Sequence, residues 1–353
     1  MGMTEPKDLT ATADTAGTAD PNDPTGPAGA AVTRKPDLVT LDEVRAAARR
    51  VTEVARRTPL LRCDGLHGGH RVFVKAENLQ STGSFKVRGA ANALLSLDPR
   101  PRSVVTFSAG NHGAAVALVG RALGVTVTVC MPPGAVAAKV GAVRRYGGEI
   151  VFTDDLIGSA AALAAERGCP VLHPFDDPAV IAGQGTTALE IFEEVPHPDV
   201  ILVPVGGGGL ISGVAAVTAA LSDGTRVIGV EPETAPTVGH ALRRGTPEPL
   251  PVPPRSAADG LNAPRTGALP LAHVRQHAVE LVTVGEEDIR RAWPLMAAET
   301  RLLVEPSAAV TVAALRSGRI GLPECATVVL IATGGNTSLG ALGDAASSAN
   351  AVP

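Results

Sequence analysis

The segment Asp199-Val200-Ile201-Leu202-Val203-Pro204-Val205 runs into Gly206-Gly207-Gly208-Gly209, and an Ala-rich stretch over 209–222 follows. The continuous apolar run predicts a buried strand, and the stretch beyond the glycines predicts a helix. Strands without polar alternation are typical of parallel sheets that are covered on both faces. We therefore expect an α/β fold in which this glycine loop joins the carboxyl end of a strand to the start of a helix.

The alternation of strand and helix extends through most of the chain. A capping box from Thr40 to Glu43 predicts a helix that runs to about Arg57. Alternating β and α segments predict open, twisted, mostly parallel sheets, in which ligands bind beyond the carboxyl ends of the strands. The other strands are expected over 71–75, 103–107, 126–130, 149–152, 226–230 and 327–332, and the other helices over 113–124, 136–146, 157–167 and 184–195.

Composition indicates a globular protein with a small-molecule partner. The chain has 353 residues, 45% of them hydrophobic, which is enough apolar material for one or two domains. Its net charge of -4, without a dense Lys/Arg cluster, gives no footprint for nucleic acid or an anionic membrane, and no apolar run is long enough to span a bilayer. The cysteines lie far apart without zinc-site spacing, so we expect reduced, buried thiols in a cytoplasmic protein: Cys63, Cys130, Cys169 and Cys325.

The two ends of the chain differ from the rest. Residues 1–37 are rich in Ala, Thr, Asp, Pro and Gly and show no periodicity, so we expect a disordered tail, and its acidic residues argue against a signal peptide. After Asn336 a short segment rich in Ala and Ser follows, and we expect residues 341–353 to be a flexible tail.

The segment Ser81-Thr82-Gly83-Ser84-Phe85-Lys86-Val87-Arg88-Gly89 places one lysine at the predicted start of a helix. Ser84 is expected to be the N-cap of a helix from Phe85 to about Leu97, and the helix dipole would then disfavour the charged form of Lys86. A lysine that loses its proton near neutral pH can form a Schiff base with an aldehyde. The alternative is an ordinary exposed lysine near a helix start.

Three polar or glycine-rich loops follow predicted strands and should meet at one sheet edge. Ser108-Ala109-Gly110-Asn111-His112-Gly113 offers backbone N–H groups and an amide for a carboxylate or phenolate oxygen. Gly206 to Gly209 could wrap a phosphate, and Thr333-Gly334-Gly335-Asn336 offers a neutral hydroxyl at a strand tip. Taken singly, each loop could equally be a tight turn.

Two common nucleotide-binding motifs are absent from the glycine loop and from the lysine segment. No G-x-G-x-x-G register fits residues 206–213, and Lys86 follows a phenylalanine where a Walker loop requires glycine. A nicotinamide cofactor stays open as an alternative only because Glu231 ends the next predicted strand, roughly where a ribose-binding acid would fall.

Taken together and in this order, S-T-G-S-F-K-V-R-G-A, S-A-G-N-H-G, G-G-G-G-L-I-S-G and T-G-G-N resemble the pyridoxal-phosphate enzymes of the threonine dehydratase and serine racemase family, which have the tryptophan synthase β-like fold. The resemblance covers roughly residues 40–340. It implies a large cofactor domain of residues 38–102 and 178–340, a small mobile domain of residues 103–177, and pyridoxal 5'-phosphate in the cleft between them. It also suggests a homodimer.

The resemblance assigns a role to each motif. Lys86 would be the catalytic residue that binds the cofactor aldehyde, with Phe85 packed on the ring, Asn111 at the ring hydroxyl and Thr333 at the pyridine nitrogen. Gly206, Gly207, Gly208 and Gly209 would hold the phosphate, and Glu305 would lie near the ring. The substrate carboxylate would be bound by Ser81, Ser108, Ala109, Gly110, Asn111 and His112.

The implied reaction is β-elimination of L-threonine or L-serine to a 2-oxo acid and ammonia. A threonine at the pyridine nitrogen makes the ring a moderate electron sink, which suits elimination. Serine racemases of the family have a serine at the position of Ala109, and because a methyl group cannot carry a proton, we expect racemisation to be poor. Elimination from another β-substituted amino acid such as 3-hydroxyaspartate, β-replacement, racemisation, or a sensor that has lost turnover are the alternatives.

Metal binding is in doubt. In the family a cation site uses an acid, a backbone carbonyl and a second acid; Glu231 and Ala235 match, but Thr237 stands at the third position, which weakens a site for Mg²⁺ or another hard cation. His273 and His277 have i, i+4 spacing without a third ligand in sight, so we expect a solvated helix face. The family's C-terminal regulatory domain is not expected.

Overall fold

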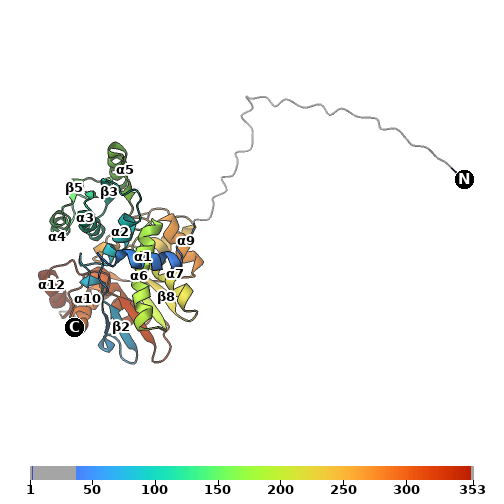
Figure 1. Ribbon diagram of the computed structural model, residues 1–353. Coiled ribbons are helices and arrows are strands. Elements are labelled where there is room, and N and C mark those ends of the chain that lie inside the picture. Colours follow the sequence, from blue (N-terminus) through green and yellow to red (C-terminus); the bar gives the residue numbers. More distant parts are fainter. Residues whose placement is uncertain (1, 3–36, 351–353) are drawn as a thin grey trace. The chain divides into compact units, whose positions relative to one another are not determined.

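Two separate β-sheets organise the computed structural model of the protein, which describes Gly2 and residues 37–350. One sheet has six strands in the order β1-β2-β10-β7-β8-β9, and the other has four strands in the order β5-β4-β3-β6 (Figure 1). Apart from Gly2 and Asp37, the predicted disordered tail lies outside the described residues.

The six-stranded sheet is parallel except at one edge. Its strands are β1 (Leu60–Arg62), β2 (Arg71–Lys75), β7 (Val200–Pro204), β8 (Arg226–Pro232), β9 (Glu280–Val284) and β10 (Thr327–Ile331). Only β1 and β2 pair antiparallel, with Leu61 opposite Val74. The parallel pairs bring the carboxyl ends of β7, β8 and β10 to one edge of the sheet, where ligands of such folds bind.

Helices cover both faces of this sheet, and the strand β7 shows why. Successive side chains of a strand point to opposite faces. Ile201 and Val203 pack against α1 (Leu41–Val51), α6 (Pro178–Glu194) and α7 (Gly209–Leu221). Val200 and Leu202 pack on the other side against α10 (Glu286–Thr300) and α11 (Pro306–Arg316). All five residues of β7 are buried, in agreement with the continuous apolar run.

The four-stranded sheet is built from the stretch between α2 (Lys86–Leu95) and α6, and its strands are β3 (Ser103–Phe107), β4 (Thr126–Met131), β5 (Glu149–Phe152) and β6 (Val171–Leu172). All its pairs are parallel. Val104 packs toward α3 (Asn111–Leu123), and Val105 and Phe107 pack toward α5 (Leu156–Arg167). Figure 1 shows these helices around the green strands, apart from the blue, yellow and red elements of the larger sheet. Whether the two sheets move as separate domains stays a prediction.

Most predicted elements are present, with ends shifted by a few residues. The capping box at Thr40 is formed, but α1 stops at Val51 instead of near Arg57. The prediction missed the short or half-buried strands β1, β6 and β9, because their partial exposure hides the alternation of apolar and polar residues. It also missed helices whose apolar face is assembled with distant segments. The missed helices are α10, α11, α8 (Thr237–Arg244), α9 (Ala268–Gln276) and α12 (Leu339–Asn350). Helix α4 (Ala137–Arg145) was predicted. The structure also contains 3-10 turns at Asp64–Leu66, Glu77–Leu79 and Asp259–Leu261.

Helix α6 begins six residues earlier than expected. Asp177 caps it by accepting a hydrogen bond from the backbone N–H of Val180, and Pro178 occupies its first position. Glycines in its first turns lowered its apparent helix propensity. A Cβ on Gly183 would lie 2.6 Å from the carbonyl oxygen of Arg88, so the glycine is required by the close approach of α6 to α2.

Two expectations about the periphery are wrong. Residues 341–350 are not a flexible tail: they belong to α12, where Leu342 and Ala345 pack against the core. The cysteines are free, but only Cys63 and Cys130 are buried; Cys169 is half-buried and Cys325 is exposed, because it lies in a turn with φ 54°. None of the described helices is both long and apolar enough to cross a bilayer.

Candidate active site

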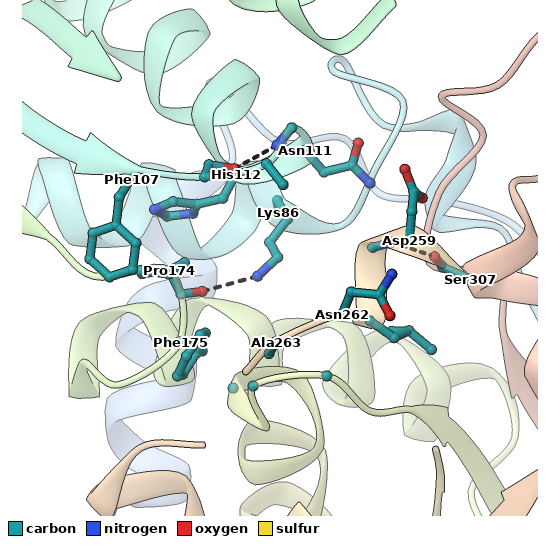
Figure 2. A pocket seen from close by; sticks show the side chains of 18 of the residues that line it. Lys86, Phe107, Asn111, His112, Pro174, Phe175, Asp259, Asn262, Ala263 and Ser307 are labelled. Carbon is teal, nitrogen blue, oxygen red and sulfur yellow. Dashed lines mark hydrogen bonds between the residues drawn. The ribbon is translucent and has the colours of Figure 1, made fainter. Parts of the chain in front are cut away.

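A cavity of about 410 Å³ lies where the predicted motifs meet (Figure 2). Its wall is made by the start of α2, the loops after β3, β7 and β10, and the segment between β6 and α6. The structure thus brings together most of the predicted site residues: Phe85, Lys86, Ser108, Ala109, Gly110, Asn111, His112, Gly206, Gly207, Gly208, Gly209, Glu305 and Thr333.

Lys86 points into this cavity from the first residue of α2 (Figure 2). Its Nζ donates a hydrogen bond to the carbonyl oxygen of Pro174 at 3.0 Å. Desolvation by the surrounding protein lowers the pKa of Lys86 from 10.5 to about 8. The lowered pKa was expected from the helix dipole, but its cause is burial. An amine with this pKa is a nucleophile and a base near neutral pH.

The helix start differs from the prediction in one respect. Ser84 is not the N-cap: that position belongs to Phe85, whose backbone is already helical and whose side chain makes no cap hydrogen bond. Ser84 instead forms a β-bridge with Gly334, and the N–H of Phe85 donates to the carbonyl oxygen of Thr333 at 3.0 Å. The lysine loop is therefore attached to the loop after β10.

The glycine loop after β7 has the form of an anion cradle. Gly208 has φ +96°, a conformation that side chains rarely adopt, and it precedes α7 without any side-chain cap. The first N–H groups of a helix have no partner within the helix, and together with the dipole they attract a phosphate. A Cβ on Gly207 would lie 2.2 Å from the ring of Phe175, so only glycine fits at this wall.

Two further groups fit a pyridine ring. Thr333 follows β10, and its buried hydroxyl has no hydrogen-bond partner among the described residues. Such an orphaned hydroxyl on a pocket wall matches the neutral partner expected for a ring nitrogen. Asn111 begins α3, and its Nδ2 donates to Oε1 of Glu305 at 2.8 Å. Burial raises the pKa of Glu305 to about 7. The donor set of lysine, amide, hydroxyl and glycine cradle fits pyridoxal phosphate.

Two histidines in this wall remain neutral. Burial, with the nearby charge of Lys86, lowers the pKa of His112 well below its ordinary value and that of His173 to about 4. Nδ1 of His173 accepts the backbone N–H of Asp176 at 2.8 Å and that of Phe175 at 3.3 Å. Because Nδ1 therefore carries no proton, Nε2 of the neutral ring must carry one. His173 was not among the predicted site residues, although it lies just after the short strand β6.

Charged residues of the wall were also missed. Lys139 of α4 is buried and forms an ion pair with Asp259, at 2.5 Å between Nζ and Oδ2. This pair connects the helix α4 of the four-stranded sheet to a turn beside the larger sheet. Arg265 also lines the cavity but stays exposed, and within residues 37–350 it has no ion pair. No local pattern marks these residues, because their partners are distant in sequence.

Ser81 is not on the cavity wall. Its hydroxyl donates to the carbonyl oxygen of Val54 at 3.3 Å, and its own carbonyl oxygen accepts the hydroxyl of Tyr146 at 3.1 Å. The predicted contact of Ser81 with a substrate carboxylate therefore has no support in the geometry.

The residues of the doubtful cation site do not fit a divalent cation. The carboxylate of Glu231 is buried and accepts the backbone N–H groups of Val238 and Gly239 at 2.6 and 3.0 Å, so it caps α8. The hydroxyl of Thr237 donates a hydrogen bond to the carbonyl oxygen of Ala263, and the backbone N–H of Thr237 donates one to the carbonyl oxygen of Ala235. A hard cation prefers several charged oxygens, and here one carboxylate is already engaged.

The histidine pair is also explained without metal. His273 is buried, not solvated as expected, and its Nε2 accepts the backbone N–H of Val39 at 3.1 Å. His277 is half-buried beside it, with ring centroids 5.7 Å apart. Across the described part of the chain, no three His, Cys, Asp or Glu side chains are grouped so that they could hold a metal ion.

Comparison with known proteins agrees with this geometry. The family model for "pyridoxal-phosphate dependent enzyme" matches residues 51–334. An L-threonine ammonia-lyase of Thermotoga maritima is 38% identical over 79% of this chain and 71% of its own length. An L-threo-3-hydroxyaspartate ammonia-lyase of Saccharomyces cerevisiae is 38% identical over 76% of this chain and 85% of its own. The solved structure of maize serine racemase superposes with a TM-score of 0.82 at 34% identity, covering 88% of this chain and 98% of the other.

Proposed function

The chain belongs to the family of pyridoxal-phosphate-dependent enzymes, in its threonine dehydratase and serine racemase group, and on this premise we propose that it is an ammonia-lyase for L-threonine and L-serine. The products would be a 2-oxo acid and ammonia. The observation that carries the proposal is the pairing of one amine of lowered pKa, Lys86, with the methyl group of Ala109 on the same cavity wall.

The cofactor supplies an electron sink for the carbanion character that develops at the substrate α-carbon. The cradle of Gly206 to Gly209 would hold its phosphate, Thr333 its ring nitrogen and Asn111 its ring hydroxyl. The N–H groups of Asn111 and His112 at the start of α3 would bind the substrate carboxylate. Those of Ser108 and Gly110 are already donated to the carbonyl oxygen of Cys130 and to Oγ of Ser108. Backbone groups would thereby bind both the cofactor phosphate and the substrate carboxylate. Because these groups are already in place, they need not reorganise during the reaction.

Lys86 would act as the base that removes the α-proton. With a pKa of about 8, its amine is neutral in about one molecule in ten at pH 7, against about one in three thousand at the ordinary value of 10.5. At Ala109 the cavity wall carries a methyl group, so no hydroxyl or carboxyl group at that position could return a proton to the α-carbon of the substrate. Elimination needs only one base, whereas racemisation needs a second acid.

The test is incubation of the purified holoenzyme with L-threonine, L-serine and their D-isomers, with 2-oxo acid and ammonia as readouts. We expect oxo acid from L-threonine and L-serine, and from L-serine far more pyruvate than D-serine by chiral chromatography. The variant K86A should release neither product. Silence with both L-substrates, or D-serine in excess of pyruvate, would reject the proposal.

A second substrate class is favoured by Arg265. Lys139 is committed to Asp259, whereas Arg265 is an exposed cation on the cavity wall that has no acidic partner in the described chain. A second carboxylate on the substrate, as in L-threo-3-hydroxyaspartate, could pair with it. The variant R265A should then raise KM about tenfold for 3-hydroxyaspartate and leave KM for threonine unchanged. Equal effects on both substrates would rule out this role.

We further propose that residues 103–177 form a small domain that closes over the substrate, and that the enzyme acts in the cytoplasm as a homodimer. Support for the first point comes from the two sheets, which share no strand while both contribute to the cavity wall. Closure would exclude water from the reaction. Small-angle scattering with and without a substrate analogue tests the closure, and sedimentation equilibrium tests the dimer.

A further inference from the structure

Asn336 ends the T-G-G-N loop and bridges two other loops of the site. Its Nδ2 donates to the carbonyl oxygen of Thr82 at 2.9 Å and to Oδ1 of Asn111 at 2.8 Å. Thr82 belongs to the lysine loop, and Asn111 begins α3 beside the smaller sheet. A side-chain amide has two N–H groups, and both are therefore used.

These contacts determine how the amide of Asn111 is oriented. Its Oδ1 receives the hydrogen bond from Asn336, and its Nδ2 gives one to Glu305 at 2.8 Å. The opposite orientation would set Oδ1 against the carboxyl group of Glu305 and Nδ2 against Nδ2 of Asn336. The contact with Asn336 would then set donor against donor, and the contact with Glu305 would set acceptor against acceptor whenever that carboxyl group is ionised. One orientation is left, and in it the second N–H of Asn111 has no partner among the described residues and is available to a ligand.

Backbone contacts between the T-G-G-N loop and the lysine loop fix the position of Asn336. The N–H of Gly335 donates to the carbonyl oxygen of Gly83 at 2.9 Å, next to the bridge between Ser84 and Gly334. Gly83 has φ +72°, and a Cβ there would lie 2.4 Å from Oδ1 of Asn336. The glycine of the lysine segment thus makes room for this side chain.

We infer that Asn336 is a positioning residue for the cofactor: it acts through Asn111, whose amide it holds so that the free N–H serves the ring-hydroxyl oxygen of pyridoxal phosphate. The inference rests on the proposed contact between Asn111 and that oxygen. Asn336 itself is not on the cavity wall, so no direct role in binding is assigned to it.

A double-mutant cycle tests the link. The variants N336A, N111A and N336A/N111A are compared with the wild-type protein by titration with pyridoxal phosphate, with the visible absorption of the lysine-bound cofactor as readout. We expect N336A to raise the Kd of the cofactor about tenfold, the effect of about one lost hydrogen bond. In the N111A background the same substitution should change Kd less than twofold.

A second variant separates positioning from a merely structural role. In N336D an oxygen replaces Nδ2 and faces the oxygens of Thr82 and Asn111, so Asn111 should turn away. We expect N336D to shift the pH dependence of the visible band as N111A does, with far-ultraviolet circular dichroism unchanged. The matched control is N92D, because Asn92 is buried, its Nδ2 donates to the carbonyl oxygen of Ala179, and it lies outside the cavity wall. N92D should lower stability without moving the band.

The outcomes distinguish the link from the proposed function. If N336A raises Kd by the same factor in both backgrounds, or leaves it unchanged in the wild-type background, the link is overturned while the assignment of Asn111 stands. If N111A alone leaves Kd unchanged, the proposed contact of Asn111 fails and the link with it. Failure of the proposed reaction would instead appear as absent ammonia release with normal cofactor binding.

Discussion

Replacing Arg88 by methionine should destabilise the protein severely, because this side chain neutralises a buried cluster of charges. Arg88 lies on α2, two residues after Lys86, and is 1% exposed. Its guanidinium donates to both oxygens of Glu77 at 2.8 Å and to both oxygens of Glu190 at 2.7 and 2.9 Å. Lys75 pairs with Glu190 at 2.6 Å, so the cluster contains two positive and two negative groups.

The expected loss follows from what Arg88→Met leaves behind. Glu190 keeps Lys75, but Glu77 is fully buried and would keep only neutral donors, the hydroxyl of Thr58 and the amide of Gln80. Removing one partner of a buried ion pair costs about 3–5 kcal/mol, because the other charge stays uncompensated. The exposed pair of Arg226 and Glu280 serves as control, and Arg226→Met should cost less than about 1 kcal/mol.

Urea unfolding of the holoenzyme, at equal cofactor saturation, measures both losses through circular dichroism and the fluorescence of the single tryptophan, Trp293. The double variant R88M/E77Q removes the uncompensated charge and should recover at least half of the loss. If R88M costs no more than R226M, or if E77Q brings no recovery, the argument from buried charge is wrong.

The cluster also predicts a pH dependence. Burial alone would raise the pKa of Glu190, but hydrogen bonds and charge from Arg88 and Lys75 hold it below its ordinary value of 4.5. A carboxyl group whose pKa is lowered by folding stabilises the protein above its unfolded pKa, and this contribution is lost as the pH falls. Wild-type stability should therefore decline below about pH 4.5, and more steeply than that of R88M, in unfolding curves recorded between pH 3 and pH 7.

Three further predictions concern the site. Uptake of pyridoxal phosphate by the cofactor-free protein, followed by visible absorbance, should rise with pH with a midpoint near pH 8, because deprotonation of Lys86 creates the reactive amine; a midpoint near pH 10.5 would contradict the burial argument. Chelators and added Mg²⁺ should leave activity and the thermal midpoint unchanged, because the carboxylate of Glu231 caps α8. A fall of activity with EDTA that Mg²⁺ restores would show that the residues around Glu231 do bind a divalent cation. Ala109→Ser should raise the ratio of D-serine to pyruvate formed from L-serine at least tenfold, since a hydroxyl could then carry a proton; an unchanged ratio would show that Ala109 does not limit racemisation.

Local pattern was sufficient to place the chemistry on the fold. Glycine or polar loops directly after continuous apolar strands had to gather at one sheet edge, because parallel strands end on the same side. Asn111, Gly206 to Gly209 and Thr333 were found in this way, Lys86 was found from its place at a predicted helix start, and the structure brings them to one cavity. The α/β class followed from the same runs, since a strand without polar alternation can only be buried on both faces.

The contacts that tune these groups depend on pairs of residues far apart in the chain, and no periodicity reports them. Lys139 meets Asp259, Asn336 meets Asn111, and the buried His273 accepts the N–H of Val39. Even the lowered pKa of Lys86 has its source in enclosure by several segments, not in the helix start that the sequence revealed. Chain-local spacing therefore determined which groups reach the site, while desolvation and long-range hydrogen bonds, which exist only after folding, decided their protonation and orientation.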